Sequence, residues 1–438
     1  MSNLNLIPIG KLFDLEKGSL QSSKCTEGEY TFITAAEEWK TNNEYSHECE
    51  ALIFAAAASG SLGRTHYIND KFITSDLCFI LTPKDSKYPI NLKFYHFVFN
   101  SLKDEIVKNT KSGTSKESIN QSNLRNYEIP YFEIDKQNLW IDKLVNTKLI
   151  KEDLELELST GQSLLKQLKQ TILQEAIEGK LTEKWRVKNP DIGTAKELLE
   201  QIKTEKEKLI KEKKIRPSKP LSPINEDEIP FDIPESWKWQ YLQDISLNIH
   251  YGFNASANHE KKDVRLLRIT DIQDNQVNWT TVPGCEYTKK DLKTYSLNEN
   301  DILIARTGGT IGKSYIVKNL SVVSIFASYL IRVIPSQNVY ADFLKFFIES
   351  PLYWKQLHDA AWGAGQPNVN GTSLSKLLLP FPPFEEQKEI VATLEKLFFI
   401  CDEIEIEINQ NKTTVDNLMA TVLKEAFETK ENIHEYKA

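Results

Sequence analysis

The clearest pattern in the chain is a long alternation of apolar residues near its C-terminal end. Apolar side chains recur at steps of three and four with one polar layer, at Leu394, Leu397, Cys401, Ile404, Ile408, Asn411, Val415, Leu418 and Val422. This spacing predicts a coiled-coil helix over 385–428. The same register, 250 residues earlier (404 − 154 = 250), predicts a helix over 138–180 through Leu154, Leu158, Gly161, Leu165, Leu168 and Ile172.

Both predicted helices contain stretches that a strand would also suit. Leu and Glu alternate over 153–158, and Ile and Glu alternate over 403–408. Their position inside a sustained heptad pattern favours helix. A helix of about 40 residues is roughly 60 Å long at 1.5 Å per residue. Because a globular segment separates the two helices, we expect them to pack antiparallel, with one globular domain at each end of the pair.

The chain repeats itself with a period near 250 residues. Matching segments occur in one order: 153–158 with 403–408, 171–178 with 421–428 and 119–130 with 369–380, each shifted by 250, and 59–64 with 308–313, shifted by 249. A repeat at one offset indicates a tandem duplication. In the first repeat, Ala55–Ala58 stand where the second has Ile304–Thr307, so Arg306 has no arginine counterpart.

Each repeat opens with a globular part that mixes strands and helices. Ile302–Ala305 and Ala51–Phe54 have the pattern of short buried strands that lead into glycine-rich turns. Phe343–Ile348 and Phe94–Phe99 have the pattern of short amphipathic helices, each preceded by a strand that ends at a proline, Pro335 or Pro83. We therefore expect an α+β fold with two globular domains, over 1–137 and 237–384.

The segment 181–236 between the repeats is different in character. Thr194 to Lys214 predicts a charged helix with a thin apolar stripe, and a proline-rich connection follows from Pro217 to Pro234. The lysines from Lys203 to Lys219 could hold DNA, although a solvated charged helix is the favoured interpretation. The last residues, 429–438, are expected to form a tail.

Composition narrows the classes of protein without deciding between them. The chain has 438 residues, with 40% hydrophobic and 26% charged residues, which is typical of a soluble protein of two or more domains. No apolar run is long enough to span a bilayer, and no secretory signal is visible. Five scattered cysteines without a CxxC pair suggest reduced thiols in the cytoplasm and no zinc site. A net charge of −8 does not exclude nucleic acid as a binding partner, because DNA affinity depends on local contacts of Lys and Arg with phosphate.

Each segment that is similar to an enzyme motif lacks a part that the motif requires. Gly308–Ser314 falls one residue short of a phosphate-binding loop, because Thr307 occupies the first glycine position and a strand-like segment follows. Phe381–Phe384 is similar to an amino-methyltransferase motif but lacks the leading Asp or Asn. Pro190-Asp191 with Glu212–Lys214 fits a nuclease pattern only within a charged linker. The histidines form no HxxxH or HExxH, so we expect no catalysis and no metal in this chain.

The chain resembles the specificity subunits of type I restriction–modification systems over nearly its whole length. The residues that carry the resemblance are Arg306–Lys313, Gly365–Asn370, Leu379–Gln387 with Ile390, and Leu173–Leu181 with Trp185, Asn189-Pro190 and the stretch from Pro217 to Trp239. These segments occur in the order that the family has them. The resemblance implies two target-recognition domains and a spacer coiled coil of two antiparallel helices.

The same resemblance implies a function and a set of partners. Each domain would read one half of a bipartite, asymmetric site in double-stranded DNA. The coiled coil would dock two methyltransferase subunits, and restriction–translocase subunits would complete an assembly with adenine-N6 methyltransferase and ATP-dependent endonuclease activity. This subunit would hold no cofactor, since S-adenosylmethionine, ATP and Mg²⁺ belong to the partner subunits. The docking residues would be those of the coiled-coil seam: Leu154, Leu158, Leu165, Leu168, Ile172, Leu394, Leu397, Ile404, Ile408, Val415, Leu418 and Val422.

A glycine turn holds the first candidates for DNA contact. Backbone N–H groups of a glycine turn can approach phosphate, and Arg or Lys can add charge and bidentate contact to guanine. The candidates are Arg306, Thr307, Thr310 and Lys313 at this turn, Ser61 and Arg64 in the first repeat, Arg265 and Arg268 as phosphate contacts, and Gln366 beside Trp362 in a glycine-rich loop. Gly308, Gly309 and Gly312 could equally serve only to shape a tight turn, and Trp362 could be a core residue.

A rival interpretation is a non-enzymatic adaptor. In that case the coiled coil joins proteins and the globular domains bind peptides, without DNA readout. Salt dependence discriminates the two, because DNA binding weakens steeply with salt.

Overall fold

The protein is described by a computed structural model that covers residues 5–58, 60–84, 87–113, 117–273, 275–361 and 369–428. The chain divides into two compact units. The first unit comprises 1–161 and 407–438, and the second comprises 162–406. Each unit therefore contains one globular domain together with parts of both long helices.

The domain of the first unit is built on a sheet of strand order β2-β7-β5-β6-β3-β4. Its strands are β1 (Leu6–Pro8), β2 (Phe13–Lys17), β3 (Tyr30–Ile33), β4 (Lys40–Asn42), β5 (His47–Ala55), β6 (Thr65–Thr74), β7 (Cys78–Pro83), β8 (Lys111–Ser112), β9 (Ser118–Ile119) and β10 (Glu128–Pro130). Its short helices are α1 (Ile9–Leu12), η1 (Ser22–Lys24), α2 (Leu92–Ser101), α3 (Lys103–Thr110) and α4 (Gln121–Asn126). The predicted strand at 51–54, the strand end at Pro83 and the helix at 94–99 are all confirmed.

The domain of the second unit has a four-stranded sheet of order β12-β19-β16-β17. Its strands are β11 (Lys238–Tyr241), β12 (Ser246–Tyr251), β13 (Arg265–Leu267), β14 (Ile272–Gln273), β15 (Gln276–Val277), β16 (Ile302–Ala305), β17 (Ser314–Ile316), β18 (Ser324–Phe326), β19 (Leu330–Pro335) and β20 (Leu378–Phe381). Its helices are α8 (Leu242–Ile245), η3 (Ile269–Asp271), α9 (Lys289–Tyr295), η4 (Gly308–Thr310), α10 (Ala341–Phe347), α11 (Pro351–Ala361) and α12 (Gly371–Ser375). The predicted strands and helix of this repeat are confirmed as well.

The long helices are α5 (Ile134–Ile177), α13 (Phe384–Asp416) and α14 (Leu418–Glu428). The 44 residues of α5 give a length of about 66 Å. The prediction of one helix over 385–428 misses a break at Asn417. There the side-chain amide of Asn417 donates to the Thr413 carbonyl at 2.8 Å, which is how Asn competes with the helical backbone.

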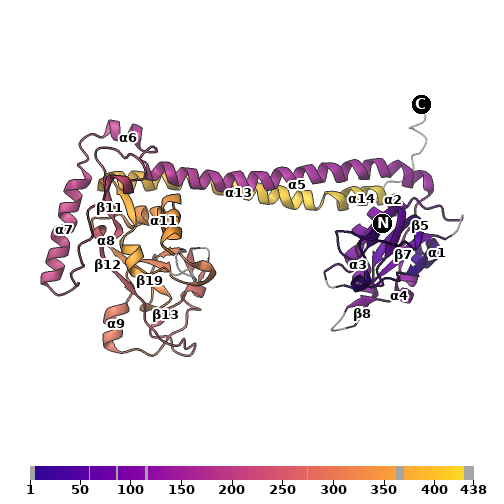
Figure 1. Ribbon diagram of the computed structural model, residues 1–438, viewed down its shortest axis with the longest axis horizontal. Coiled ribbons are helices and arrows are strands. Elements are labelled where there is room, and N and C mark those ends of the chain that lie inside the picture. The colour runs from indigo at the N-terminus through magenta and orange to yellow at the C-terminus, as the bar shows by residue number, and fades with distance from the viewer. Residues whose placement is uncertain are drawn as a thin grey trace. The chain divides into compact units, whose positions relative to one another are not determined.

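The helices run antiparallel within each unit. In the first unit, Lys143 Nζ lies 3.0 Å from Glu425 Oε2, and the Cβ position of Gly161 lies 3.6 Å from Ile408 Cδ1. The end of α14 packs against α2, and Leu423 and Ala426 belong to the first domain's core (Figure 1). In the second unit, Lys169 Nζ contacts Asp402 Oδ1 at 2.9 Å.

The predicted seam is only partly buried. Leu165, Ile172, Leu394 and Val415 are buried between or beneath the helices. Leu168 and Ile404 are 45% and 39% exposed, so they do not lie in the closed part of the seam. In a pair of helices, side chains beside the contact face remain open to solvent because the partner helix covers only one face.

The two repeats join domain to helix through the same side-chain contact. Gln137 and Gln387 are each the fourth residue of their helix, fully buried, and 250 residues apart (387 − 137 = 250). The Gln137 amide donates to the Phe132 carbonyl at 2.6 Å and accepts from Asn91 N at 2.7 Å. The Gln387 amide likewise donates to the Pro382 carbonyl at 2.9 Å and accepts from Tyr340 N at 2.8 Å. This shared contact supports the duplication independently of sequence.

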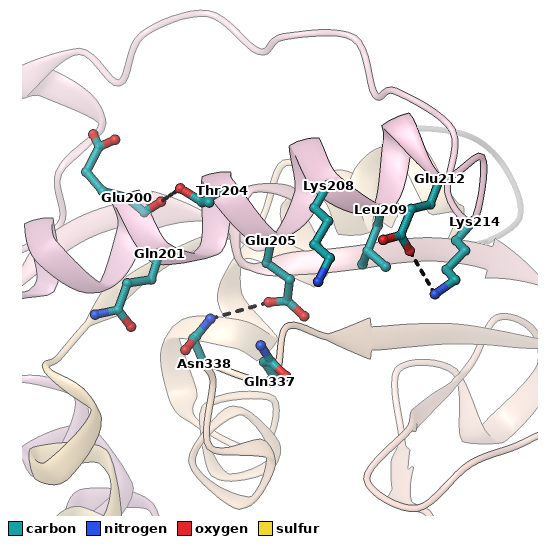
Figure 2. A pocket seen from close by; sticks show the side chains of 10 residues that line it. All are labelled: Glu200, Gln201, Thr204, Glu205, Lys208, Leu209, Glu212, Lys214, Gln337 and Asn338. Atoms are coloured by element: carbon teal, nitrogen blue, oxygen red, sulfur yellow. Dashed lines mark hydrogen bonds and ion pairs between the residues drawn. The ribbon is translucent and has the colours of Figure 1, made fainter.

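The segment between the repeats attaches to the second domain. It forms α6 (Glu183–Lys188), α7 (Ala195–Lys211) and η2 (Glu226–Glu228), and the predicted charged helix is confirmed. The thin stripe of α7 (Ala195, Leu198 and Ile202) is buried in the second domain's core. Glu205 accepts a hydrogen bond from the Ser336 hydroxyl. It also accepts one from the Asn338 amide at 3.4 Å, which Figure 2 shows.

A buried carboxylate fixes the start of α13 to this segment. Glu386 is fully buried and accepts from Thr182 Oγ1 at 2.7 Å, Arg186 Nε at 2.9 Å and Trp237 Nε1 at 2.8 Å. These donors come from both ends of the connecting segment, so Glu386 closes it onto the helix. No helix in the described ranges is long and apolar enough to cross a membrane.

Candidate DNA-recognition site

The glycine turn of the second domain joins β16 to β17. Ala305 N donates to the Lys313 carbonyl at 2.9 Å, and Gly312 N donates to the Ala305 carbonyl at 2.8 Å, which closes the turn. The turn brings together the four candidates that the sequence placed there. Lys313 is exposed, whereas Arg306 and Thr310 are half-buried.

The three glycines of the turn have different structural requirements. Gly312 has a φ of +80°, and a Cβ there would lie 2.3 Å from Leu357 Cδ2 and 2.7 Å from Trp354 Cζ3. Gly308 has a φ of +78°, but in the part of the chain that the structure describes no heavy atom lies within 4 Å of its Cβ position. Gly309 has a negative φ, and among the described residues no heavy atom lies within 4 Å of its Cβ position. Only Gly309 therefore lacks an internal reason to be glycine, and the open space beside it suits the approach of an external partner.

Arg306 ties three loops of the second domain together. Its backbone N donates to the Tyr329 carbonyl at 3.1 Å, and its carbonyl accepts from Val369 N at 3.0 Å. Its guanidinium carbon lies 4.7 Å from the centroid of the Tyr251 ring, and its Nε is buried without a hydrogen-bond partner among the described residues. Sequence reasoning missed Tyr251, because it precedes Arg306 by 55 residues and only the sheet brings them together (306 − 251 = 55).

The first domain repeats the turn with different side chains. Ala55 N donates to the Arg64 carbonyl at 2.8 Å and Gly63 N donates to the Ala55 carbonyl at 2.8 Å, the pattern seen at Ala305. By this pattern Ala55 corresponds to Ala305, so setting Ala55–Ala58 against Ile304–Thr307 is wrong by one residue. The reason is an extra residue in the first turn, since nine positions separate Ala55 from Arg64 and eight separate Ala305 from Lys313 (64 − 55 = 9; 313 − 305 = 8).

Ser61 and Arg64 lie together on this first turn. Arg64 Nη1 donates to Ser61 Oγ and to the Ala35 carbonyl, both at 3.2 Å. Glu37 Oε2 lies 3.8 Å from Arg64 Nη2. Arg64 is therefore already engaged with a neighbouring loop, which it holds in place.

Arg265 and Arg268 also have internal partners. Arg265 Nη1 donates to the Val282 carbonyl at 2.7 Å. Arg268 forms a bidentate pair with Asp271, with Nε to Oδ2 at 2.9 Å and Nη2 to Oδ1 at 2.7 Å. These contacts give both arginines a structural role, and their contact with phosphate stays a prediction. Gln366 and Trp362 lie outside the described residues.

A neutral histidine lies next to Tyr251 in the chain. Burial, followed by the positive charge of Arg332, lowers the pKa of His250 to about 4. The His250 ring packs against Phe326 with centroids 5.5 Å apart. At neutral pH His250 therefore adds no charge beside the Arg306 stack.

The long helices expose large apolar side chains, of which Leu168 and Ile404 belong to the predicted seam and the others named here do not. In the first unit these are Leu139, Leu149, Ile150 and Leu156. In the second unit they are Leu164, Leu168, Phe399, Ile400, Ile404 and Ile406. Of the predicted docking residues, Leu165, Ile172, Leu394 and Val415 are buried, and docking by the seam stays a prediction. Exposed apolar clusters of this kind mark interaction sites.

Comparison with known proteins agrees with the duplicated architecture. The family model described as type I restriction modification DNA specificity domain matches residues 1–158 and 234–412. The chain belongs to this family. The two matched ranges correspond to the two domains described above, each of mixed helix and sheet and each joined to a long helix.

The chain is similar to specificity subunits of type I restriction enzymes, and the matched share of the chain differs between them. The type I restriction enzyme EcoAI specificity subunit of Escherichia coli is 32% identical over 263 residues, which are 59% of this chain and 44% of the relative. This chain thus spans less than half the length of that relative. The EcoKI specificity subunit of Escherichia coli strain K12 is 23% identical over 89% of this chain and 76% of its own length. A solved chain from a study of type I R-M complex assembly and conformational transition has a TM-score of 0.70 with 13% identity, covers 98% of both chains and shows the same fold.

Proposed function

We propose that this chain is the non-catalytic specificity subunit of a type I restriction–modification complex. Each domain would read one half of a bipartite, asymmetric site in double-stranded DNA. The observation that carries this proposal is the duplicated turn. In the second domain this turn combines Arg306 and the exposed Lys313 with Gly309, at which no contact among the described residues requires glycine. Backbone N–H groups and cations placed together in this way suit phosphate and base-edge contact.

The partners would dock on the long helices. The exposed apolar side chains around Leu149 and Leu156 in the first unit, and around Phe399 and Ile406 in the second, support two docking places for methyltransferase subunits. Restriction–translocase subunits would join them. S-adenosylmethionine, ATP and Mg²⁺ would be held by these partners and not by this chain, in a cytoplasmic assembly.

The decisive experiment compares DNA binding by the complex reconstituted with methyltransferase subunits. Arg306→Ala combined with Lys313→Ala should weaken binding to one half-site by roughly 10- to 100-fold, since a bidentate base contact is worth about 1–3 kcal/mol. Assembly with the methyltransferase, measured by size-exclusion chromatography, should not change. Binding of the unaltered complex should fall steeply as salt rises.

The adaptor interpretation predicts different outcomes. An adaptor would form its complexes without preferring duplex DNA, and salt would have little effect on a peptide interface. A complex that assembles but binds no specific duplex would therefore refute the proposal. Equal DNA affinity before and after the double substitution would remove Arg306 and Lys313 from the site while leaving the function open to test by methylation mapping.

A further inference from the structure

We infer that Tyr251 is a positioning residue that holds the Arg306 guanidinium for contact with DNA, and that the first domain reads its half-site without such a pair. The inference rests on the proposed function and deepens it. The ligand would be a pair of hydrogen-bond acceptors in the duplex, either a guanine edge or phosphate oxygens.

The Tyr251 ring is fixed from two sides. Its backbone ends β12, where Tyr251 pairs with Ile331 of β19. Its hydroxyl accepts a hydrogen bond from Gly371 N at 3.0 Å. The residue is nevertheless 40% exposed. A rigid aromatic ring at the surface is a platform on which a planar cation can stack.

The guanidinium carbon of Arg306 lies over this ring, 4.7 Å from its centroid. A stacked guanidinium keeps its donors at the edge of its plane, where they match two acceptors at once. The backbone of Arg306 is held by Tyr329 and Val369, so most of the remaining freedom lies in the side chain. Removing the ring would release that side chain without changing its charge.

The duplication provides an internal comparison. Gly18 N donates to the Cys78 carbonyl at 3.0 Å, as Gly252 N donates to the Leu330 carbonyl at 3.1 Å, so the strands preceding these glycines correspond. Tyr251, next to Gly252, therefore corresponds to Lys17, next to Gly18.

Strand pairing and the turn extend this comparison to both members of the stack. Lys17 pairs with Phe79 as Tyr251 pairs with Ile331. The hydrogen bonds of the turn place Ala56 at the position of Arg306, since Ala56 N donates to the Leu77 carbonyl as Arg306 N donates to the Tyr329 carbonyl. At the two matched positions the first domain thus has Lys17 in place of the ring and Ala56 in place of the arginine, so the effect of the Tyr251–Arg306 contact should be confined to one half-site.

The experiment measures methylation by the reconstituted complex on duplex libraries in which each half-site of the wild-type target is varied one base pair at a time. Tyr251→Leu and Arg306→Ala should each lower methylation of the target by about 10-fold or more, and any change in base preference should fall in the same half-site for both. Tyr251→Phe keeps the ring and loses only the hydrogen bond from Gly371 N, so it should lower methylation clearly less than Tyr251→Leu does. Lys17→Leu, the matched position in the first domain, should leave that half-site's preference unchanged.

Each outcome decides the inference. A relaxed preference at one base pair assigns the contact to a guanine edge, whereas a loss that is uniform across sequences, with a smaller salt slope, assigns it to phosphate. Wild-type methylation with Tyr251→Leu, or a loss with Tyr251→Phe equal to that with Tyr251→Leu, would overturn the role of the ring. Relaxation in both half-sites would overturn the asymmetry. If the wild-type complex modified no bipartite site, the proposed function itself would fail, which is a separate result.

Discussion

Adding one methyl group to Gly309 or to Gly312 should have opposite effects on the second domain. At Gly312, an alanine must adopt a left-handed φ of +80°, which costs about 1–2 kcal/mol. Its Cβ would also lie 2.3 Å from Leu357 Cδ2 and 2.7 Å from Trp354 Cζ3, and such overpacking costs about 1–3 kcal/mol. Gly312→Ala should therefore destabilise the domain by about 2–5 kcal/mol.

Gly309→Ala meets neither obstacle. The φ of Gly309 is negative and no heavy atom of the described residues lies within 4 Å of its Cβ position, so alanine should leave stability unchanged or raise it by about 0.4–1 kcal/mol. If DNA approaches the turn here, the same methyl should weaken binding of the reconstituted complex to its target. The expected signature is a stable variant that binds DNA poorly.

Urea unfolding and DNA titration of the two variants test this reasoning together. Gly312→Ala serves as the control that loses stability first. The reasoning is refuted if Gly309→Ala unfolds at a lower urea concentration than the wild type, because the open space would then be occupied. It is also refuted if Gly309→Ala binds the target duplex as the wild type does, because no partner would then approach that side of the turn.

Three further perturbations test other parts of the structure. Glu386→Ala leaves buried donors unpaired and should cost about 3–5 kcal/mol in urea unfolding, and a cost below about 1 kcal/mol would contradict the role of that carboxylate. Because the pKa of His250 is lowered to about 4, the stabilisation from the neutral ring is present above pH 6.5 and is lost as pH falls toward 4. Melting temperatures between pH 7 and 4.5 should thus fall less for His250→Gln than for the wild type. Gln137→Ala and Gln387→Ala should each cost about 1–3 kcal/mol, with faster hydrogen exchange confined to the domain that carries the change.

Local patterns in the sequence predicted most of the fold. The strand ends at Pro83 and Pro335 were predicted from the positions of these prolines, because proline has no N–H to donate to a neighbouring strand. The heptad pattern predicted the long helices, because apolar side chains at steps of three and four lie on one face of a helix. The break at Asn417 escaped prediction, since a single side chain that bonds to a carbonyl four residues earlier leaves no periodic signal.

The candidate site was less predictable, because its parts come together only in three dimensions. The turn itself was visible from its glycines, but the stack on Tyr251 depends on strand pairing across 55 residues (306 − 251 = 55). The extra residue in the first turn shifted the alignment at Ala55, which only hydrogen bonds could correct. The exposed Phe399 and Ile406 lie off the seam, so a search for steps of three and four passed over them.

The paired glutamines at the base of the long helices have a consequence for how such proteins can change. Gln137 and Gln387 each hold only main-chain groups, a carbonyl five residues earlier and the amide at the start of a domain helix. Contacts to main-chain atoms do not depend on which side chains a domain carries. Under the proposed function, a domain with a different surface could therefore be exchanged at this point while keeping the same contact to the helix, so new target sequences could arise by recombination.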